Sequence, residues 1–70
     1  MDIKKDKHLT EKIFRLLDCI YKEGYASIPA LPSWVWNDYR DLTHKEVVVY
    51  TNLWIDSRNI DHPHLTVPNA

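Results

Sequence analysis

The stretch LTEKIFRLLDCIYKE, residues 9–23, decides the fold. At about 100° per residue, its large aliphatic side chains share one side, and its charged side chains share the other. The aliphatic side holds Leu9, Ile13, Leu16, Leu17 and Ile20, flanked by Phe14 and Tyr21. This pattern predicts an amphipathic helix over 9–23. Gly24 follows and tolerates positive φ, so we expect a Schellman cap there that packs Tyr25 back on Ile20.

The next segment, ASIPALPS at residues 26–33, carries two prolines. A proline pushes the residue before it away from helical conformation. Ile28 and Leu31 precede Pro29 and Pro32, so we expect an extended connection that lies against the core. Ser33 then serves as the predicted N-cap of a short helix over 34–40.

A start signal for a third helix stands at residues 42–47. Thr43 and Glu46 match the capping box, and Leu42 with Val47 matches the hydrophobic staple. These pairs predict a helix from His44 to about Ser57. The β-branched run within 47–55 also fits a strand, and this alternative stays open at the level of sequence.

Together these segments predict an all-α fold: a small three-helix domain with a Pro-rich loop after the first helix. We expect one domain over residues 1–57, with a short N-terminal arm at 1–8, and an extended tail over 58–70. The predicted core consists of Leu9, Ile13, Phe14, Leu16, Leu17, Ile20, Trp36, Tyr39, Val47, Tyr50 and Trp54.

The composition of the chain argues against some classes of protein function. The 70-residue chain is 44% hydrophobic and has a net charge of −1, which does not favour nucleic-acid binding, because phosphate neutralisation needs a basic patch. Cys19 is the only cysteine, so an intramolecular disulfide is impossible. With no apolar run of membrane-spanning length and no signal-peptide pattern, we expect a cytoplasmic protein without membrane contact.

The sequence offers few candidate residues for metal binding, cofactor binding or catalysis. His62 and His64 flank Pro63, but no helical histidine pair or Cys-x-x-Cys motif accompanies them, so we expect no metal and no cofactor. With one glycine, the chain lacks a phosphate-binding loop. Carboxylates near the predicted helix ends are explained by capping and dipole effects. We therefore expect no enzymatic activity and assign no catalytic residue.

A helix-turn-helix DNA-binding regulator, built from residues 34–57, is an alternative function. The predicted second and third helices are joined by a turn of suitable length, although that turn lacks glycine. A recognition helix reads bases with its N-terminal residues. The candidate DNA-binding residues are Arg40, His44, Lys45, Asn52 and Arg58.

Protein–protein contact is the function that the sequence favours. The predicted third helix is apolar around nearly its whole girth, and such a helix is buried on more than one side. We therefore expect a protein partner, or a second copy in a homodimer, to contact Val49 and Leu53, with Trp34 as a further interface residue. The alternative is that the tail, through Ile60, Leu65 and Val67, covers this helix.

Overall fold

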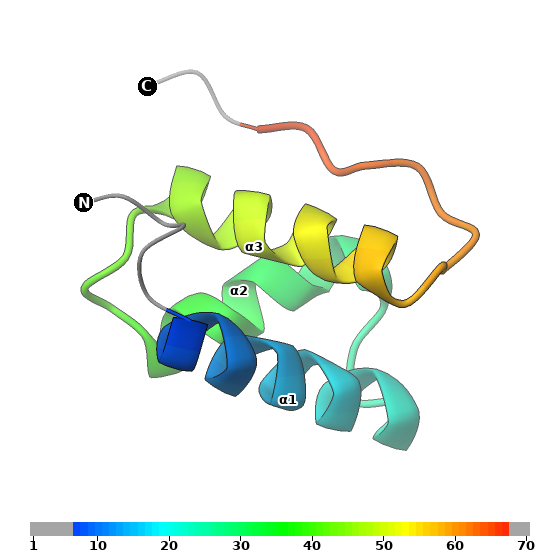
Figure 1. The fold of residues 1–70 in the computed structure, drawn as a ribbon, viewed down its shortest axis with the longest axis horizontal. Helices are drawn as coiled ribbons and strands as arrows, with labels where there is room; N and C mark the ends of the chain where they lie inside the picture. Colours follow the sequence, from blue (N-terminus) through cyan, green and yellow to red (C-terminus); the bar gives the residue numbers. More distant parts are fainter. Residues whose placement is uncertain (1–6, 68–70) are drawn as a thin grey trace.

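The amphipathic segment forms α1, Lys7–Glu23, in the computed structural model, which describes residues 7–67 (Figure 1). The helix begins two residues before the predicted start, so Lys7 and His8 are helical and the rest of the predicted arm lies outside the described residues. Ile13, Leu17 and Ile20 are buried in the core, as their spacing predicts. Leu9, Phe14 and Leu16 are partly buried and pack against that core.

The predicted Schellman cap ends α1. Gly24 has φ +72°, its N–H donates to the Tyr21 carbonyl, and the Tyr25 N–H donates to the Ile20 carbonyl. These bonds satisfy carbonyls that the last turn leaves unpaired. The Tyr25 side chain, however, is 62% exposed and stacks on Trp34 instead of being buried against Ile20.

The Pro-rich segment is helical, which corrects the expectation of an extended loop. Residues Ile28–Ala30 form the 3₁₀ turn η2, and α2 follows directly as Leu31–Asp38. Ala30, and not Ser33, is the N-cap residue. Pro29 and Pro32 fit because the first N–H groups of a helix have no intrahelical acceptor, so a residue without an N–H loses nothing there.

The earlier start of α2 changes which side chains it buries. Leu31 and Val35, one turn apart, are fully buried, and Ile28 joins them in the core. Trp36, predicted to be a core residue, is 37% exposed, and its indole N–H donates to the Leu42 carbonyl at the rim. The helix ends at Asp38, and Tyr39 is partly buried against the core.

The third segment forms α3, His44–Ser57, and the strand alternative for residues 47–55 is wrong. The capping box is complete: the Glu46 N–H donates to Thr43 Oγ1 at 3.1 Å, and the Thr43 N–H donates to Glu46 Oε1 at 2.8 Å. Leu42 and Val47, the predicted staple, are both buried in the core. The α3 residues buried in the domain are Val47, Val48, Tyr50, Thr51, Trp54 and Ile55.

We expect Thr43→Ala to lower the free energy of unfolding by about 0.5–2 kcal/mol, because the substitution leaves the Glu46 N–H without its cap. Thr43→Ser is the matched control, because it keeps a hydroxyl acceptor at the same place. Urea unfolding followed by circular dichroism measures both variants. An alanine variant as stable as the parent would show that the cap contributes nothing.

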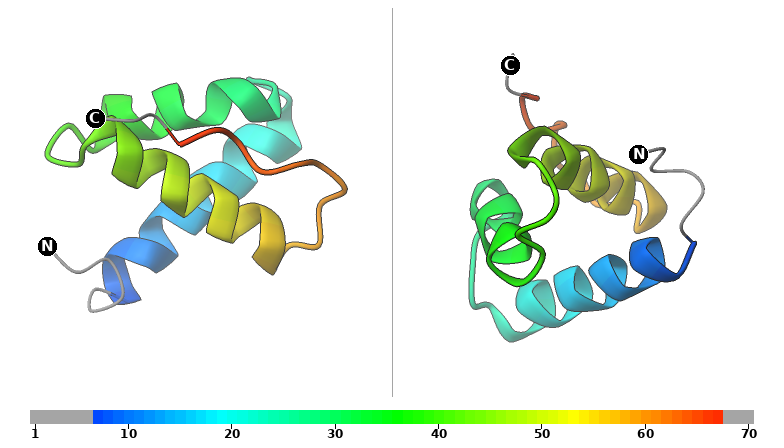
Figure 2. Two further views of the ribbon diagram at one scale, coloured as in Figure 1. Left: turned by 90° about the horizontal axis from the view of Figure 1, so that it is seen from above. Right: turned by 90° about the vertical axis from the view of Figure 1, so that its left-hand side faces the viewer.

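The three helices pack against one another in pairs, and α1 crosses α3 obliquely (Figure 2, left). After α3, the chain turns at residues 58–62, and residues 63–67 run back along the side of α3 that faces away from α1 (Figure 1). Ile60 and Leu65 of this tail pack against the core. The tail therefore covers part of the apolar surface of α3.

Candidate functional site

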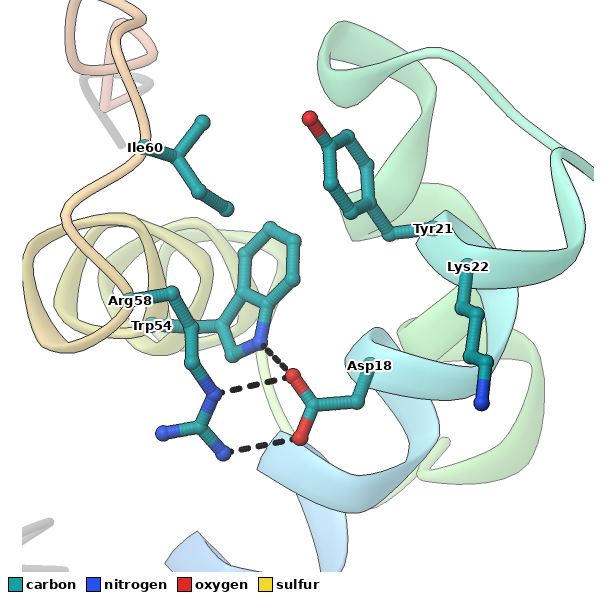
Figure 3. A pocket seen from close by; sticks show the side chains of 6 residues that line it. All are labelled: Asp18, Tyr21, Lys22, Trp54, Arg58 and Ile60. Atoms are coloured by element: carbon teal, nitrogen blue, oxygen red, sulfur yellow. Dashed lines mark hydrogen bonds and ion pairs between the residues drawn. The ribbon is translucent and has the colours of Figure 1, made fainter.

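A pocket of about 330 Å³, here the Asp18 pocket, lies where α1 meets the C-terminal end of α3 (Figure 3). Arg58 Nη2 donates to Asp18 Oδ2 at 2.8 Å, and Arg58 Nε donates to Asp18 Oδ1 at 2.9 Å. The Trp54 indole N–H donates to Asp18 Oδ1 at 2.8 Å. The pocket is lined by Asp18, Tyr21, Lys22, Trp54, Arg58 and Ile60.

Aromatic rings surround this hydrogen-bond network. The Tyr21 ring meets the Trp54 ring edge to face, with centroids 5.4 Å apart. The Arg58 guanidinium lies over the Phe14 ring, 5.5 Å from its centroid. Phe14 and Asp18 stand one turn apart on α1. Arg58 therefore makes two contacts with this helix, an ion pair with Asp18 and a cation–π contact with Phe14.

The Arg58 guanidinium lowers the pKa of the Asp18 carboxyl by hydrogen bonding to it; partial burial opposes this shift, and the Trp54 hydrogen bond adds to it. The same hydrogen bonds, which Arg58 donates to Asp18, raise the pKa of Arg58. Asp18 is therefore ionised at neutral pH and has no proton to donate as a general acid. Both of its oxygens accept hydrogen bonds from the protein, so the network joins α1 to the end of α3.

We expect Asp18→Asn to be less stable than the parent at neutral pH and equally stable in strong acid. Because the pKa of Asp18 is lowered by folding, its ionised form stabilises the domain above the unfolded-state pKa of about 3.9. That contribution is lost as the pH falls through the folded-state pKa. Urea unfolding over a pH series measures the difference, with Asp41→Asn as the exposed control. A difference that is the same at every pH would refute this assignment.

The sequence did not reveal the Asp18 pocket, because Asp18 and Arg58 lie 40 residues apart. The prediction that Trp54 lies in the core holds. Asp18, predicted on the charged side of α1 opposite to the apolar side, is instead partly buried and bonds Trp54 and Arg58. One signal pointed toward the contact: a buried tryptophan needs an acceptor for its indole N–H, and an acidic residue at the edge of an apolar face offers one.

The predicted interface residues lie on two different helices. Val49 and Leu53 stand one turn apart on α3; Leu53 is 45% exposed and Val49 is partly buried. Trp34, on α2, is also 45% exposed and stacks on Tyr25, with ring centroids 6.0 Å apart and planes inclined by 14°. Beside Trp34, a second hollow of about 320 Å³ is lined by Ser33, Trp34 and Asn37.

A third aromatic group joins the end of α2 to the start of α3. The Arg40 guanidinium lies 4.9 Å from the centroid of the Trp36 ring, and Arg40 Nη2 donates to Asn37 Oδ1 at 3.3 Å. The His44 ring meets the Trp36 ring edge to face at 6.3 Å. Two candidate DNA-binding residues, Arg40 and His44, therefore lie together, against the same tryptophan.

The other three candidate DNA-binding residues lie in different environments. Lys45 is exposed in the first turn of α3. Asn52 uses both halves of its amide to bind the backbone of Leu65, and Arg58 is paired with Asp18. For Asn52 to read an adenine edge, it would have to release the tail.

Histidine and cysteine side chains do not converge in the part of the chain that the structure describes. Cys19 is exposed on α1. His64 Nε2 lies 2.7 Å from Asp56 Oδ1, and His62 Nδ1 lies 2.7 Å from the Pro63 carbonyl oxygen. Among residues 7–67, no three His, Cys, Asp or Glu side chains are grouped so as to hold a metal ion.

Comparison with known proteins identifies no relative of this chain. No protein-family model matches the chain, and no curated protein or solved structure matches it either. Within residues 7–67, none of the helices combines the length and the apolar character that crossing a membrane requires.

Proposed function

We propose that this chain is a small non-enzymatic regulatory or adaptor protein that acts through protein–protein contacts, with a homodimer as its simplest complex. The observation that carries this proposal is the exposure of large apolar side chains in a domain that buries others of the same kind. Side chains exposed to between 37% and 62% are those of Tyr21, Tyr25, Trp34, Trp36 and Leu53.

The Tyr25–Trp34 pair has the properties of a binding hot spot. Trp and Tyr are enriched where truncation costs the most binding energy. Their stacking restrains both rings before a partner arrives, so less side-chain freedom is lost on binding. The neighbouring hollow at Ser33 and Asn37 adds polar groups beside this apolar surface.

Leu53 supports the proposal from α3. It lies on the helix side opposite to buried residues such as Thr51 and Ile55, and the partly buried Val49 stands one turn before it. A twofold contact brings the same strip from each subunit together, which is the commonest symmetric arrangement. The helix-turn-helix alternative has less support, because Asn52 and Arg58 already bind groups within the domain.

Leu53→Lys tests the homodimer, because it places a charge in the proposed contact and leaves the buried face of α3 unchanged. We expect the parent to sediment as a dimer at micromolar concentration and the variant as a folded monomer. Ser27→Lys adds the same charge at an exposed position outside α3, and we expect it to remain dimeric. A dimer that withstands Leu53→Lys would place the contact elsewhere, and a variant that unfolds would place Leu53 in the core.

A further inference from the structure

Asn52, near the middle of α3, holds the tail by both halves of its side-chain amide. Its Nδ2 donates to the Leu65 carbonyl at 3.0 Å, and its Oδ1 accepts from the Leu65 N–H at 2.8 Å. A residue in extended conformation presents its N–H and its carbonyl on the same side, as it does toward a neighbouring strand. Asn52 thus recognises backbone groups that any extended segment carries.

Two further residues lie in line with Asn52 along the helix. Val48 stands one turn before Asn52 and is only 3% exposed, and Asp56 stands one turn after it, with Oδ1 2.7 Å from His64 Nε2. Residues four apart lie side by side on a helix. Val48, Asn52 and Asp56 therefore form one line, here the α3 stripe, and the tail runs back along this helix (Figure 1).

The tail reaches the stripe through a tight reversal. Asn59 adopts φ 52°, its N–H donates to the Asp56 carbonyl, and the Ile60 N–H donates to the Ile55 carbonyl, which together make a Schellman cap. The His62 N–H donates to the Ile60 carbonyl in the next turn. If this second turn opens, the segment after it leaves its own stripe while Ile60 keeps its place.

We propose that the α3 stripe is a docking site for an extended segment, and that its partner in trans is residues 62–67 of a second copy. The structure shows that this segment fits the stripe, because within a single chain the segment is bound there by Asn52 and Asp56. Exchange of an identical element is a low-cost route to a dimer. This inference rests on the proposed self-association and adds a second contact between the two copies, beside the one at Leu53.

Competition within the chain determines how the exchange is measured. A short connection gives the tail an effective concentration on the order of millimolar at its own stripe. Exchange is therefore easiest to detect between two variants, one with a defective tail and one with a defective stripe. Leu65→Pro removes the N–H that Asn52 accepts and leaves the stripe intact. Asn52→Ala removes the amide and leaves the tail intact.

These two full-length variants, labelled with donor and acceptor dyes at the exposed Cys19, are mixed. We expect energy transfer and a one-to-one complex at a concentration where each variant alone is monomeric. The matched control replaces Asn52→Ala with the double variant Asn52→Ala/Leu65→Pro, which offers no competent tail, and we expect no complex. If Leu65→Pro disturbs the helical circular dichroism, Leu65→Gly takes its place, because it keeps the N–H but removes the side chain that packs against the core.

A peptide of residues 60–67 tests the stripe independently of dimer formation. Added to the Leu65→Pro variant, it should move the Asn52 side-chain amide resonances toward their parent positions. The same peptide methylated on the Leu65 nitrogen should bind about five-fold more weakly or worse, because one hydrogen bond is lost. Absence of peptide binding overturns the docking site. Peptide binding without a mixed complex overturns the second copy as its partner.

These results separate the inference from the proposed function. A parent dimer that Leu53→Lys dissociates, together with no complex between the two defective variants, retains the proposed self-association and rejects tail exchange. A parent that stays monomeric, together with peptide binding to the Leu65→Pro variant, rejects the homodimer and retains the docking site.

Discussion

Trp54→Ala is expected to lower the free energy of unfolding by about 3–5 kcal/mol, the usual cost of truncating a buried aromatic side chain. The Trp54 side chain is 1% exposed, contacts the Tyr21 ring and donates a hydrogen bond to Asp18. At about 0.05–0.15 kcal/mol per residue, the whole domain has roughly 3.5–10 kcal/mol of stability. The variant should therefore be partly unfolded at ambient temperature, as measured by circular dichroism and urea unfolding.

Two matched variants show what Trp54 contributes. Trp34→Ala removes the same side chain from a half-exposed position, so its cost should be well below that of Trp54→Ala. Trp54→Phe keeps much of the ring but loses the N–H that Asp18 accepts, so its cost should fall between the two. If Trp34→Ala were as destabilising as Trp54→Ala, the division into core and surface tryptophans would be wrong.

Leu31→Ala is expected to lower the free energy of unfolding by about 2–5 kcal/mol, because it leaves a cavity in the core. Leu31 is fully buried as the first residue of α2, directly after the 3₁₀ turn at Ile28–Ala30. The substitution tests the burial of Leu31. A variant as stable as the parent would show that this side chain lies at the surface.

Ser33→Ala is the control for Leu31→Ala within the same helix. Ser33 is exposed and is not the N-cap of α2, so its substitution should change stability by less than about 0.5 kcal/mol. Had Ser33 capped a helix beginning at Trp34, the same substitution would cost about 0.5–2 kcal/mol. Urea unfolding of the two variants thus distinguishes the two possible helix starts.

The sequence predicted α1 and α3 because each carries a signal that short segments can contain. In α1 that signal is the apolar spacing with Gly24 at the end, and in α3 it is the capping box of Thr43 and Glu46. The three consecutive valines of α3 favour a strand in isolation, but the burial of Val47 and Val48 in the domain outweighs this propensity.

The Pro-rich segment shows the limit of the same local reasoning. The rule that a proline moves its predecessor out of helical conformation predicts extended backbone at Ile28 and at Leu31. Both residues are instead buried, and both prolines fall at helix starts, where the missing N–H is harmless. Burial of two aliphatic side chains decides the conformation here.

The interface candidates remain predictions. Leu53 and Trp34 are exposed, whereas Val49 is partly buried. The alternative cover for α3 is the tail, and its Ile60 and Leu65 pack against the core. The bond between Asn52 and Leu65 spans 13 residues across a reversal that no local pattern indicated.

Sedimentation velocity of the unmodified chain over a dilution series tests the central claim, contact with another protein chain, most directly. The exposed Trp34 and Leu53 predict that the average mass rises from monomer to dimer as the concentration enters the micromolar range. A chain that remains monomeric at every concentration would contradict self-association through these residues.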